Sequence, residues 1–195
     1  FDVRSSFFVF LLNERWYHLD AMSRLIEVVP HDPVWAADFQ AEARKLTGVF
    51  SRDQAEIHHI GSTAIPGIMA KPVIDIMIVV AEIKTVRERI AAMGELGYEH
   101  HGEAGISGRQ FFRKDTAGMR SHHVHIFETG HPNIATQLNF RDYLRAHPAA
   151  AQAYSQLKQE LAARFCHSAP EYTDAKTDFI ANINHLAETW RKQQT

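Results

Sequence analysis

The sequence predicts an α+β fold, in which a mixed β-sheet with flanking helices is followed by a helical C-terminal third. Three observations lead to this fold class. Residues 72–80 are rich in β-branched side chains and apolar on both faces, as in a covered strand. Apolar residues between positions 35 and 50 recur at helical spacing, and from residue 133 onward they keep to helical stripes.

The composition sets limits on the class of protein. A chain of 195 residues that is 45% hydrophobic is long enough for one domain with a substantial core. Its formal net charge of −2 gives no reason to expect nucleic-acid binding. The single cysteine, Cys166, rules out an internal disulfide and is typical of a reducing cytosol, so we expect a cytoplasmic protein.

The N-terminal residues differ from the rest of the chain. The chain starts without Met, and its apolar run Phe7–Leu12 is far shorter than the about 20 residues that cross a bilayer. We therefore expect no membrane contact. We interpret residues 1–21 as an extension outside the fold and residues 22–195 as the domain, with Met22 as a candidate natural start.

The first half of the chain predicts two strands and a helix. Residues 25–29 form a short strand that Pro30 ends, and Asp32 caps a helix that begins at Pro33. Residues 55–60 form the second strand. The buried stripe of the helix consists of Trp35, Phe39, Ala43, Leu46 and Phe50.

After the strand at residues 72–80, a helix and three further strands are predicted. Gly97 ends an amphipathic helix that starts near Ile83 and buries Val86, Ile90 and Met93. The strands are 98–103, 110–114 and 122–128.

The C-terminal helices are predicted from two stripes and one capping motif. Ser168 and Glu171 have the spacing of a capping box, with Pro170 in the first turn. The first stripe consists of Tyr154, Leu157, Leu161 and Phe165, and the second of Phe179, Ile183, Leu186 and Trp190.

A candidate site begins where the strand at residues 55–60 ends. Gly61 and Ser62 would let backbone N–H groups and a hydroxyl approach a phosphate closely. Asp75, on the next strand, would present a carboxylate to a divalent metal at the same phosphates. The alternative is a tight turn beside an aspartate that hydrogen-bonds to nearby backbone.

The amino-acid sequence of this segment resembles that of the GrpB family. The resemblance extends from Leu25 to Trp190. The matching stretches are H-I-G-S-T-A-I-P-G at 59–67, A-K-P-V-I-D-I at 70–76, H-H-V-H at 122–125 and F-R-D-Y-L at 140–144. Shorter matches lie at 97–98, 102–103, 108–114 and 172–176.

The resemblance implies a nucleotidyltransferase-like fold and a nucleotide or other phosphorylated small molecule as ligand. It also implies a link to dephospho-coenzyme A kinase, to which the domain is fused in some bacteria. The superfamily pattern has a Gly-Ser turn, two alternating carboxylates on one strand and a third on a later strand. These carboxylates hold two magnesium or manganese ions.

This chain departs from that pattern at Met77, which occupies the position of the second carboxylate. A thioether does not replace an oxygen ligand for magnesium. On the later strand, His123 and His125 share one face. Together with Asp75 they would form a site for zinc, manganese or iron, or they would hydrogen-bond to a phosphate or to Asp75.

Four further residues are candidates for phosphate binding. Arg109 and Arg113 lie four residues apart on a predicted strand and would bind an anion from one face. Glu103 belongs to the same predicted strand pair, and Lys71 would reach the same anion. The alternative is a surface ladder in which Glu103 pairs across strands with one arginine.

Three functional hypotheses follow from these residues. The first is a metal-dependent nucleotidyltransferase-like enzyme that uses Asp75, His123 and His125 in catalysis, with Gly61, Ser62, Lys71, Glu103, Arg109 and Arg113 at the phosphates. The second is a module that binds a nucleotide or other anion without turnover and assists a partner enzyme. The third is a metal-dependent hydrolase built on Asp75, His123 and His125.

Overall fold

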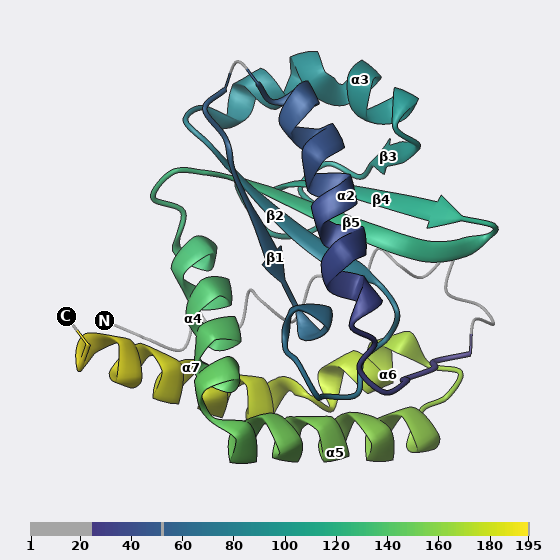
Figure 1. Ribbon diagram of the computed structural model, residues 1–195, viewed down its shortest axis with the longest axis vertical. Helices are drawn as coiled ribbons and strands as arrows, with labels where there is room; N and C mark the ends of the chain where they lie inside the picture. The colour runs from purple at the N-terminus through teal and green to yellow at the C-terminus, as the bar shows by residue number, and fades with distance from the viewer. Residues whose placement is uncertain (1–24, 52, 195) are drawn as a thin grey trace.

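The computed structural model describes residues 25–51 and 53–194 and contains a five-stranded sheet (Figure 1). The sheet order is β1-β2-β5-β4-β3. β2 and β5 are parallel and the other neighbouring pairs are antiparallel, which confirms the predicted mixed sheet. The strands are β1 (Glu56–Ile60), β2 (Ile74–Val80), β3 (Tyr98–His100), β4 (Gln110–Thr116) and β5 (Met119–Glu128).

One face of the sheet is covered by α2 (Val34–Val49), which crosses in front of the strands in Figure 1. Trp35 and Leu46 of this helix are buried against Ile76 and Ile78 of β2, in the main hydrophobic core. The predicted helix and its stripe are confirmed. Asp32 caps it by accepting the N–H of Val34 at 2.9 Å, although the helix begins one residue later than predicted.

The helix predicted after β2 consists of two successive segments of different helix type. Its first part, η3 (Ile83–Arg89), is a 3₁₀ helix, and only α3 (Ile90–Glu95) is an α-helix. Side chains three residues apart align on a 3₁₀ helix, and Ile83 and Val86 have that spacing, so both pack into the main core. Gly97, at φ +85°, follows the helix as predicted.

The opposite face of the sheet is partly apolar and partly polar. Met77 and Val79 of β2 pack with Phe127 of β5, and α4 (Pro132–Ala146) lays Ile134 and Leu138 against them. Asp75, two residues before Met77, lies on the same face at the start of β2. The polar part of this face is therefore next to a buried apolar cluster.

The C-terminal third is helical, as predicted, and forms the lower part of the molecule in Figure 1. Its cluster joins Tyr154 and Ile183 to Ile65 and Ile68, which follow the 3₁₀ turn η2 (Ser62–Ala64). The helices thus support the loop between β1 and β2. After α4 they are α5 (Pro148–Arg164), α6 (Ala169–Asp174) and α7 (Thr177–Lys192).

Three local predictions are wrong. Residues 25–29 are not a strand, because only Val29 pairs, in one bridge to Ala70. Ser168 precedes α6, but its side chain accepts no capping hydrogen bond. Leu186 is 38% exposed, since the buried stripe of α7 runs through Ile183 and Ala187 instead. The strand predicted at 98–103 is also shorter, because β3 ends at His100.

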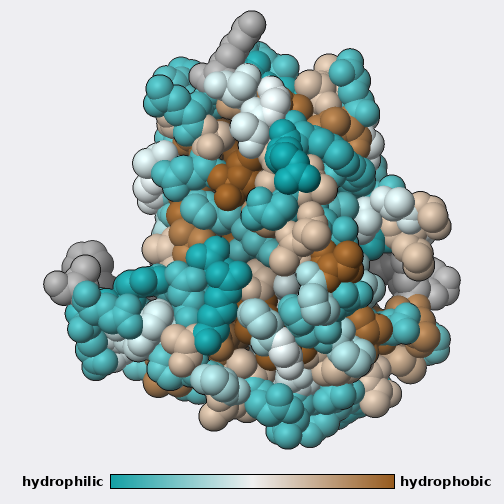
Figure 2. Space-filling view, in the orientation of Figure 1, coloured by the Kyte–Doolittle hydropathy of each residue, from teal (hydrophilic) through white to brown (hydrophobic). Residues whose placement is uncertain are grey.

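The helices of the described residues were compared with the length and hydropathy of a membrane span. No helix within the described ranges has the length and apolar character that crossing a bilayer requires. The face in Figure 2 is mostly hydrophilic, and its hydrophobic residues lie in separate small patches. The predictions for residues 1–21 and for Met22 concern positions outside the described residues.

A buried ion pair gives the fold a pH-dependent contribution. Glu42 of α2 is 3% exposed, and its carboxylate is 2.7 Å from Lys114 Nζ of β4 and 2.8 Å from Lys45 Nζ. Burial alone would raise the pKa of Glu42, but hydrogen bonds from Lys114 and Lys45 lower it to about 2. Because this pKa is below its unfolded value, the stabilisation is present above about pH 4.5 and is lost as the pH falls toward 2.

We therefore expect Glu42→Gln to be less stable than the wild type at pH 6, and the difference to shrink by about 3 kcal/mol between pH 5 and pH 2. Urea unfolding followed by circular dichroism at several pH values measures this difference. A difference that stays constant with pH would contradict the assignment.

Candidate functional site

The turn after β1 is fitted to Asp75. Gly61 has φ +69° and ψ −170°, a conformation that favours glycine. A Cβ atom at residue 61 would overlap the Asp75 carboxylate and lie 2.9 Å from both its Cβ and its Cγ. The absence of a side chain at Gly61 therefore lets the Asp75 carboxylate sit against the turn that carries Ser62.

Strand pairing brings the two histidines to the same carboxylate. In the parallel register of β2 and β5, Asp75 lies opposite His123 and Met77 opposite His125. His123 Nδ1 is 3.0 Å from Asp75 Oδ1, and His125 Nε2 is 4.0 Å from the same oxygen. The structure therefore places Asp75, His123 and His125 together. We call these three residues the Asp75 cluster.

Arginines on the far sides of the imidazoles decide where their protons lie. A guanidinium only donates hydrogen bonds, so His125 Nδ1 accepts from Arg109 Nη1 at 3.2 Å and its proton lies on Nε2, toward Asp75. His123 Nδ1 donates to Asp75, since a carboxylate only accepts. Arg120 Nη1 is 3.5 Å from the other nitrogen of His123.

The charge states follow from this arrangement. Burial, reinforced by the charge of Arg109, lowers the pKa of His125 to about 4, so its imidazole is neutral at pH 7. Burial alone would raise the pKa of Asp75, but its interactions with His123 and His125 hold the pKa of this carboxyl well below its usual range. Asp75 is therefore an ionised acceptor.

The Asp75 cluster offers three potential ligand atoms to a metal ion. One ligand atom from each member of the Asp75 cluster lies within 4.8 Å of the others. However, a ligating histidine normally donates its second N–H to an acceptor, and the second nitrogen of His125 faces Arg109. These residues do not fit a three-ligand zinc or iron site. Asp75 alone fits magnesium or manganese, provided that a bound phosphate supplies further oxygens.

Two residues of α5 lie close to the site and were missed as site residues. Burial and the charge of Asp75 raise the pKa of Tyr154 to about 12, although its interaction with Ser62 lowers it. Lys158 Nζ lies 4.4 Å from the centre of the Tyr154 ring. The signal that could have revealed Lys158 is a lysine in the buried stripe of a helix, between Tyr154 and Leu161.

Of the four predicted phosphate-binding residues, Arg109 donates to His125 of the Asp75 cluster, and Arg113 lies opposite His123 in the register of β4 and β5. Arg113 donates to His101 Nε2 at 2.6 Å and lies 3.6 Å from Glu99. The Glu103 carboxylate accepts the backbone N–H of Gly108, so it closes a loop rather than pairing with either arginine as predicted. Lys71 Nζ lies 4.5 Å from the centre of the Tyr172 ring.

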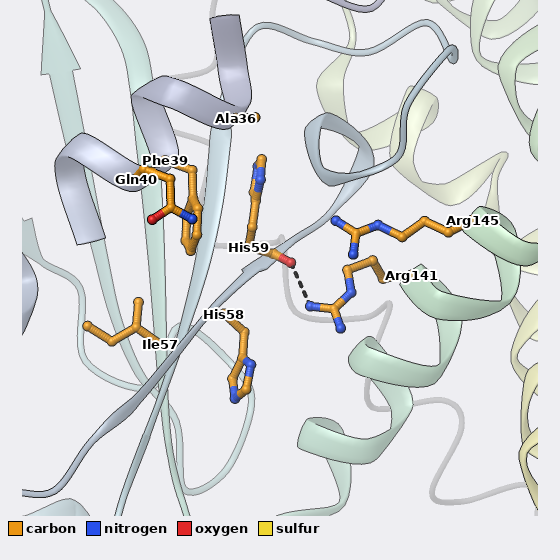
Figure 3. A pocket seen from close by; sticks show the side chains of 8 residues that line it. All are labelled: Ala36, Phe39, Gln40, Ile57, His58, His59, Arg141 and Arg145. Atoms are coloured by element: carbon orange, nitrogen blue, oxygen red, sulfur yellow. Dashed lines mark hydrogen bonds between the residues drawn. The ribbon is translucent and has the colours of Figure 1, made fainter. Parts of the chain in front are cut away.

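A pocket of about 310 Å³ lies beside β1, where α2 and α4 meet it (Figure 3). His59 stacks on Phe39 there, with ring centroids 4.6 Å apart, and Arg141 and Arg145 point toward them from α4. Arg141 donates to the His59 carbonyl and Arg145 to the Ala64 carbonyl. Both ends of the turn that carries Gly61 and Ser62 are thereby held.

The chain is similar to proteins of one family. The family model described as GrpB protein matches residues 25–185. The UPF0157 protein YqkA of Bacillus subtilis is 42% identical over 169 residues, which are 87% of this chain and 49% of YqkA. The UPF0157 protein PA4798 of Pseudomonas aeruginosa is 35% identical over 87% of this chain and 70% of its own length. The chain thus spans about half the length of YqkA.

Two solved structures and one longer relative extend the comparison. The GrpB crystal structure from Enterococcus faecalis matches with a TM-score of 0.79 and 36% identity, over 84% of this chain and 99% of that one. The Cid1 poly(U) polymerase with MgGTP bound matches with a TM-score of 0.52 and 13% identity, over 70% and 45%. This second likeness confirms the nucleotidyltransferase-like fold alone. A dephospho-CoA kinase of Mycolicibacterium paratuberculosis is 26% identical over 85% of this chain and 46% of the kinase.

The contact between Gly61 and Asp75 leads to a stability prediction with a matched control. Gly61 and Gly67 both have positive φ, but a Cβ at Gly67 meets nothing within 4 Å. Gly67→Ala therefore carries backbone strain alone, whereas Gly61→Ala also displaces Asp75. We expect Gly61→Ala to lower the free energy of unfolding by about 1–3 kcal/mol more than Gly67→Ala. Equal losses in urea unfolding would contradict the contact.

Proposed function

The chain belongs to the GrpB family, and we propose that it binds a nucleotide or another phosphorylated small molecule at the Asp75 cluster. The observation that carries this proposal is the meeting of three segments: the Gly61–Ser62 turn, Asp75 on β2 and the two imidazoles on β5. A turn without a side chain at its glycine offers backbone N–H groups and the Ser62 hydroxyl to a phosphate.

Binding is better supported than turnover by two metal ions. Two-metal transfer needs a second carboxylate near the first. Met77 holds that position and is fully buried in an apolar cluster with Ile60 and Phe127, where a carboxylate would be strongly destabilised. The geometry therefore favours a binding module whose single carboxylate would hold one metal ion together with the phosphates of the ligand.

Nucleotidyl transfer is the second candidate, and the fold favours it. Cid1, which shares this fold, is a poly(U) polymerase whose crystal structure contains MgGTP. If this chain transfers a nucleotidyl group, a divalent metal would bind at Asp75 together with the phosphates of the substrate and would neutralise their charge. The residues of the chain itself would hold the phosphates at Ser62 and keep Asp75 ionised through His123 and His125.

Dephospho-CoA kinases contain a segment related to this chain. The binding module would assist the kinase if both proteins bound the same ligand. We therefore include dephospho-coenzyme A, an adenine nucleotide with a diphosphate, among the ligands to test. Its kinase is the proposed partner enzyme of the binding module.

Ligand binding is tested by calorimetry with ATP, GTP, CTP, UTP and dephospho-coenzyme A. With magnesium present, we expect at least one of them to bind the wild type, and Asp75→Asn to weaken that binding about tenfold or more, because the variant loses the carboxylate that would hold the metal with the phosphates. Asp38→Asn, on the exposed side of α2, is the matched control and should bind as the wild type does. Failure of all five ligands to bind, or equal binding by Asp75→Asn, would overturn the proposal.

The effect of a divalent metal distinguishes nucleotide binding from nucleotidyl transfer. We expect protein purified without added metal to contain no stoichiometric zinc by elemental analysis, since His125 turns an N–H toward Asp75. Magnesium or manganese should give a binding heat only when a nucleotide is present, and no pyrophosphate should be released. Metal-dependent release of pyrophosphate that Asp75→Asn abolishes would make nucleotidyl transfer the function.

A further inference from the structure

The pocket beside β1 lies on the other face of the sheet from the Asp75 cluster. Ile60 of β1 lies opposite Asp75, so these two side chains share one face. Because side chains alternate along a strand, His59 points to the other face, where its ring stacks on Phe39 of α2. The pocket volume of about 310 Å³ is near the lower limit of ligand pockets, about 300–1,000 Å³, and suits a small molecule.

Hydrogen bonds fix the tautomer of His59. Its Nε2 is 3.0 Å from Thr63 Oγ1, and that hydroxyl donates its proton to the Val73 carbonyl at 3.2 Å. Since a hydroxyl has only one proton, Thr63 accepts the N–H of His59 Nε2. Burial lowers the pKa of His59 to about 4, so the ring is neutral at pH 7 and Nδ1 carries a lone pair. No described residue donates a hydrogen bond to this nitrogen.

Arg145 is a cation with unused donors beside this ring. It points from α4 toward His59 (Figure 3), and its Nε donates to the Ala64 carbonyl at 2.8 Å. This bond fixes the guanidinium and leaves its terminal nitrogens, which have no acceptor among the described residues. Partial burial and the charge of Arg141 lower the pKa of Arg145, as expected for a cation without an ion-pair partner of its own.

The second arginine of the pocket is already paired. Arg141 donates to the His59 carbonyl at 3.0 Å and forms an ion pair with Asp142 at 2.7 Å. It therefore forms part of the wall, and Arg145 is the cation that is left for a ligand. On the side away from the arginines the wall is apolar and includes Phe39 and Ile57.

We propose that this pocket binds a small 2-hydroxy carboxylate with an apolar group, as a ligand separate from the one at the Asp75 cluster. The carboxylate accepts from the terminal nitrogens of Arg145, whose planar fork matches its two oxygens. The 2-hydroxyl lies next to the carboxylate and donates to His59 Nδ1. The apolar group covers Phe39 and Ile57. A cation and a neutral acceptor thus select a ligand that has an anion and a donor side by side.

The test compares three probes at pH 7 by NMR titration of the ¹⁵N-labelled chain. Mandelate has a carboxylate, a 2-hydroxyl and a phenyl ring, while phenylacetate lacks only the hydroxyl and mandelamide lacks only the charge. We expect mandelate to bind about fivefold more tightly than phenylacetate, as one neutral hydrogen bond gives. It should bind about tenfold or more tightly than mandelamide, as a charge-assisted contact gives. Mandelate should also change the ¹⁵N shift of His59 Nδ1.

One substitution and a matched control locate the binding. Arg145→Gln should bind mandelate and mandelamide equally, because it loses the charge that distinguishes them. Arg87→Gln, at an exposed arginine of η3, should keep the preference of the wild type. The comparison of the three probes on the wild type decides the question even if Arg145→Gln is unstable.

Three results would overturn this inference. They are no binding of mandelate, equal binding of the three probes by the wild type, and a preference for mandelate over mandelamide that Arg145→Gln keeps. None of them bears on nucleotide binding at the Asp75 cluster, which lies on the opposite face of the sheet and is measured with its own ligands.

Discussion

The carboxylate of Asp75 lies between two parts of the chain that are far apart in sequence. Gly61 contacts it from the turn after β1, and His123 donates to it from β5. The turn can approach because residue 61 has no side chain, and the imidazole is opposite Asp75 because β2 and β5 pair in parallel. Ser62 and the histidines therefore reach one place through a single side chain. The helical C-terminal third supports the same turn through Tyr154.

The core beneath this site explains the departure from the two-carboxylate pattern. Met77 follows Asp75 on the same face, but it is packed under α4 rather than beside the turn. A carboxylate there would have to leave water for an apolar cluster, which is strongly unfavourable. The neighbouring His125 is fixed as a neutral donor by Arg109. The site thus has one carboxylate, which is too few ligands for two metal ions and would hold one metal ion together with a bound phosphate.

Regular periodicity made most of the fold predictable. The helix α2 buries one hydrophobic face and the strand β2 buries both, and both elements were predicted with small shifts at their ends. The strand predicted at residues 25–29 failed because pairing depends on a neighbour, and only Ala70 faces it. Within the site, alternation along β5 placed His123 and His125 on one face. The parallel register that brings them to Asp75 is a long-range contact that local patterns do not contain.

The differences within the site have another cause. The buried stripe of α5 was predicted from its apolar residues alone. The charged residue Lys158 was therefore not assigned to a buried position. Glu103 and Arg113 have partners close to them in the chain or on a neighbouring strand, and these contacts were not predicted. Whether a charged side chain faces a ligand or a neighbour depends on distances of a few ångströms, which a sequence pattern does not specify.

We infer that a hydrogen bond from His123 and the N–H of His125, 4.0 Å away, orient Asp75 without a metal. Two-bond ¹H–¹⁵N correlation NMR of the histidine side chains at pH 7 tests it most directly, with His123→Gln and His125→Gln used to assign the signals. We predict that His123 carries its proton on Nδ1 and that neutral His125 carries its proton on Nε2. A proton on Nδ1 of His125, or ¹⁵N shifts typical of metal coordination at either ring, would contradict the account.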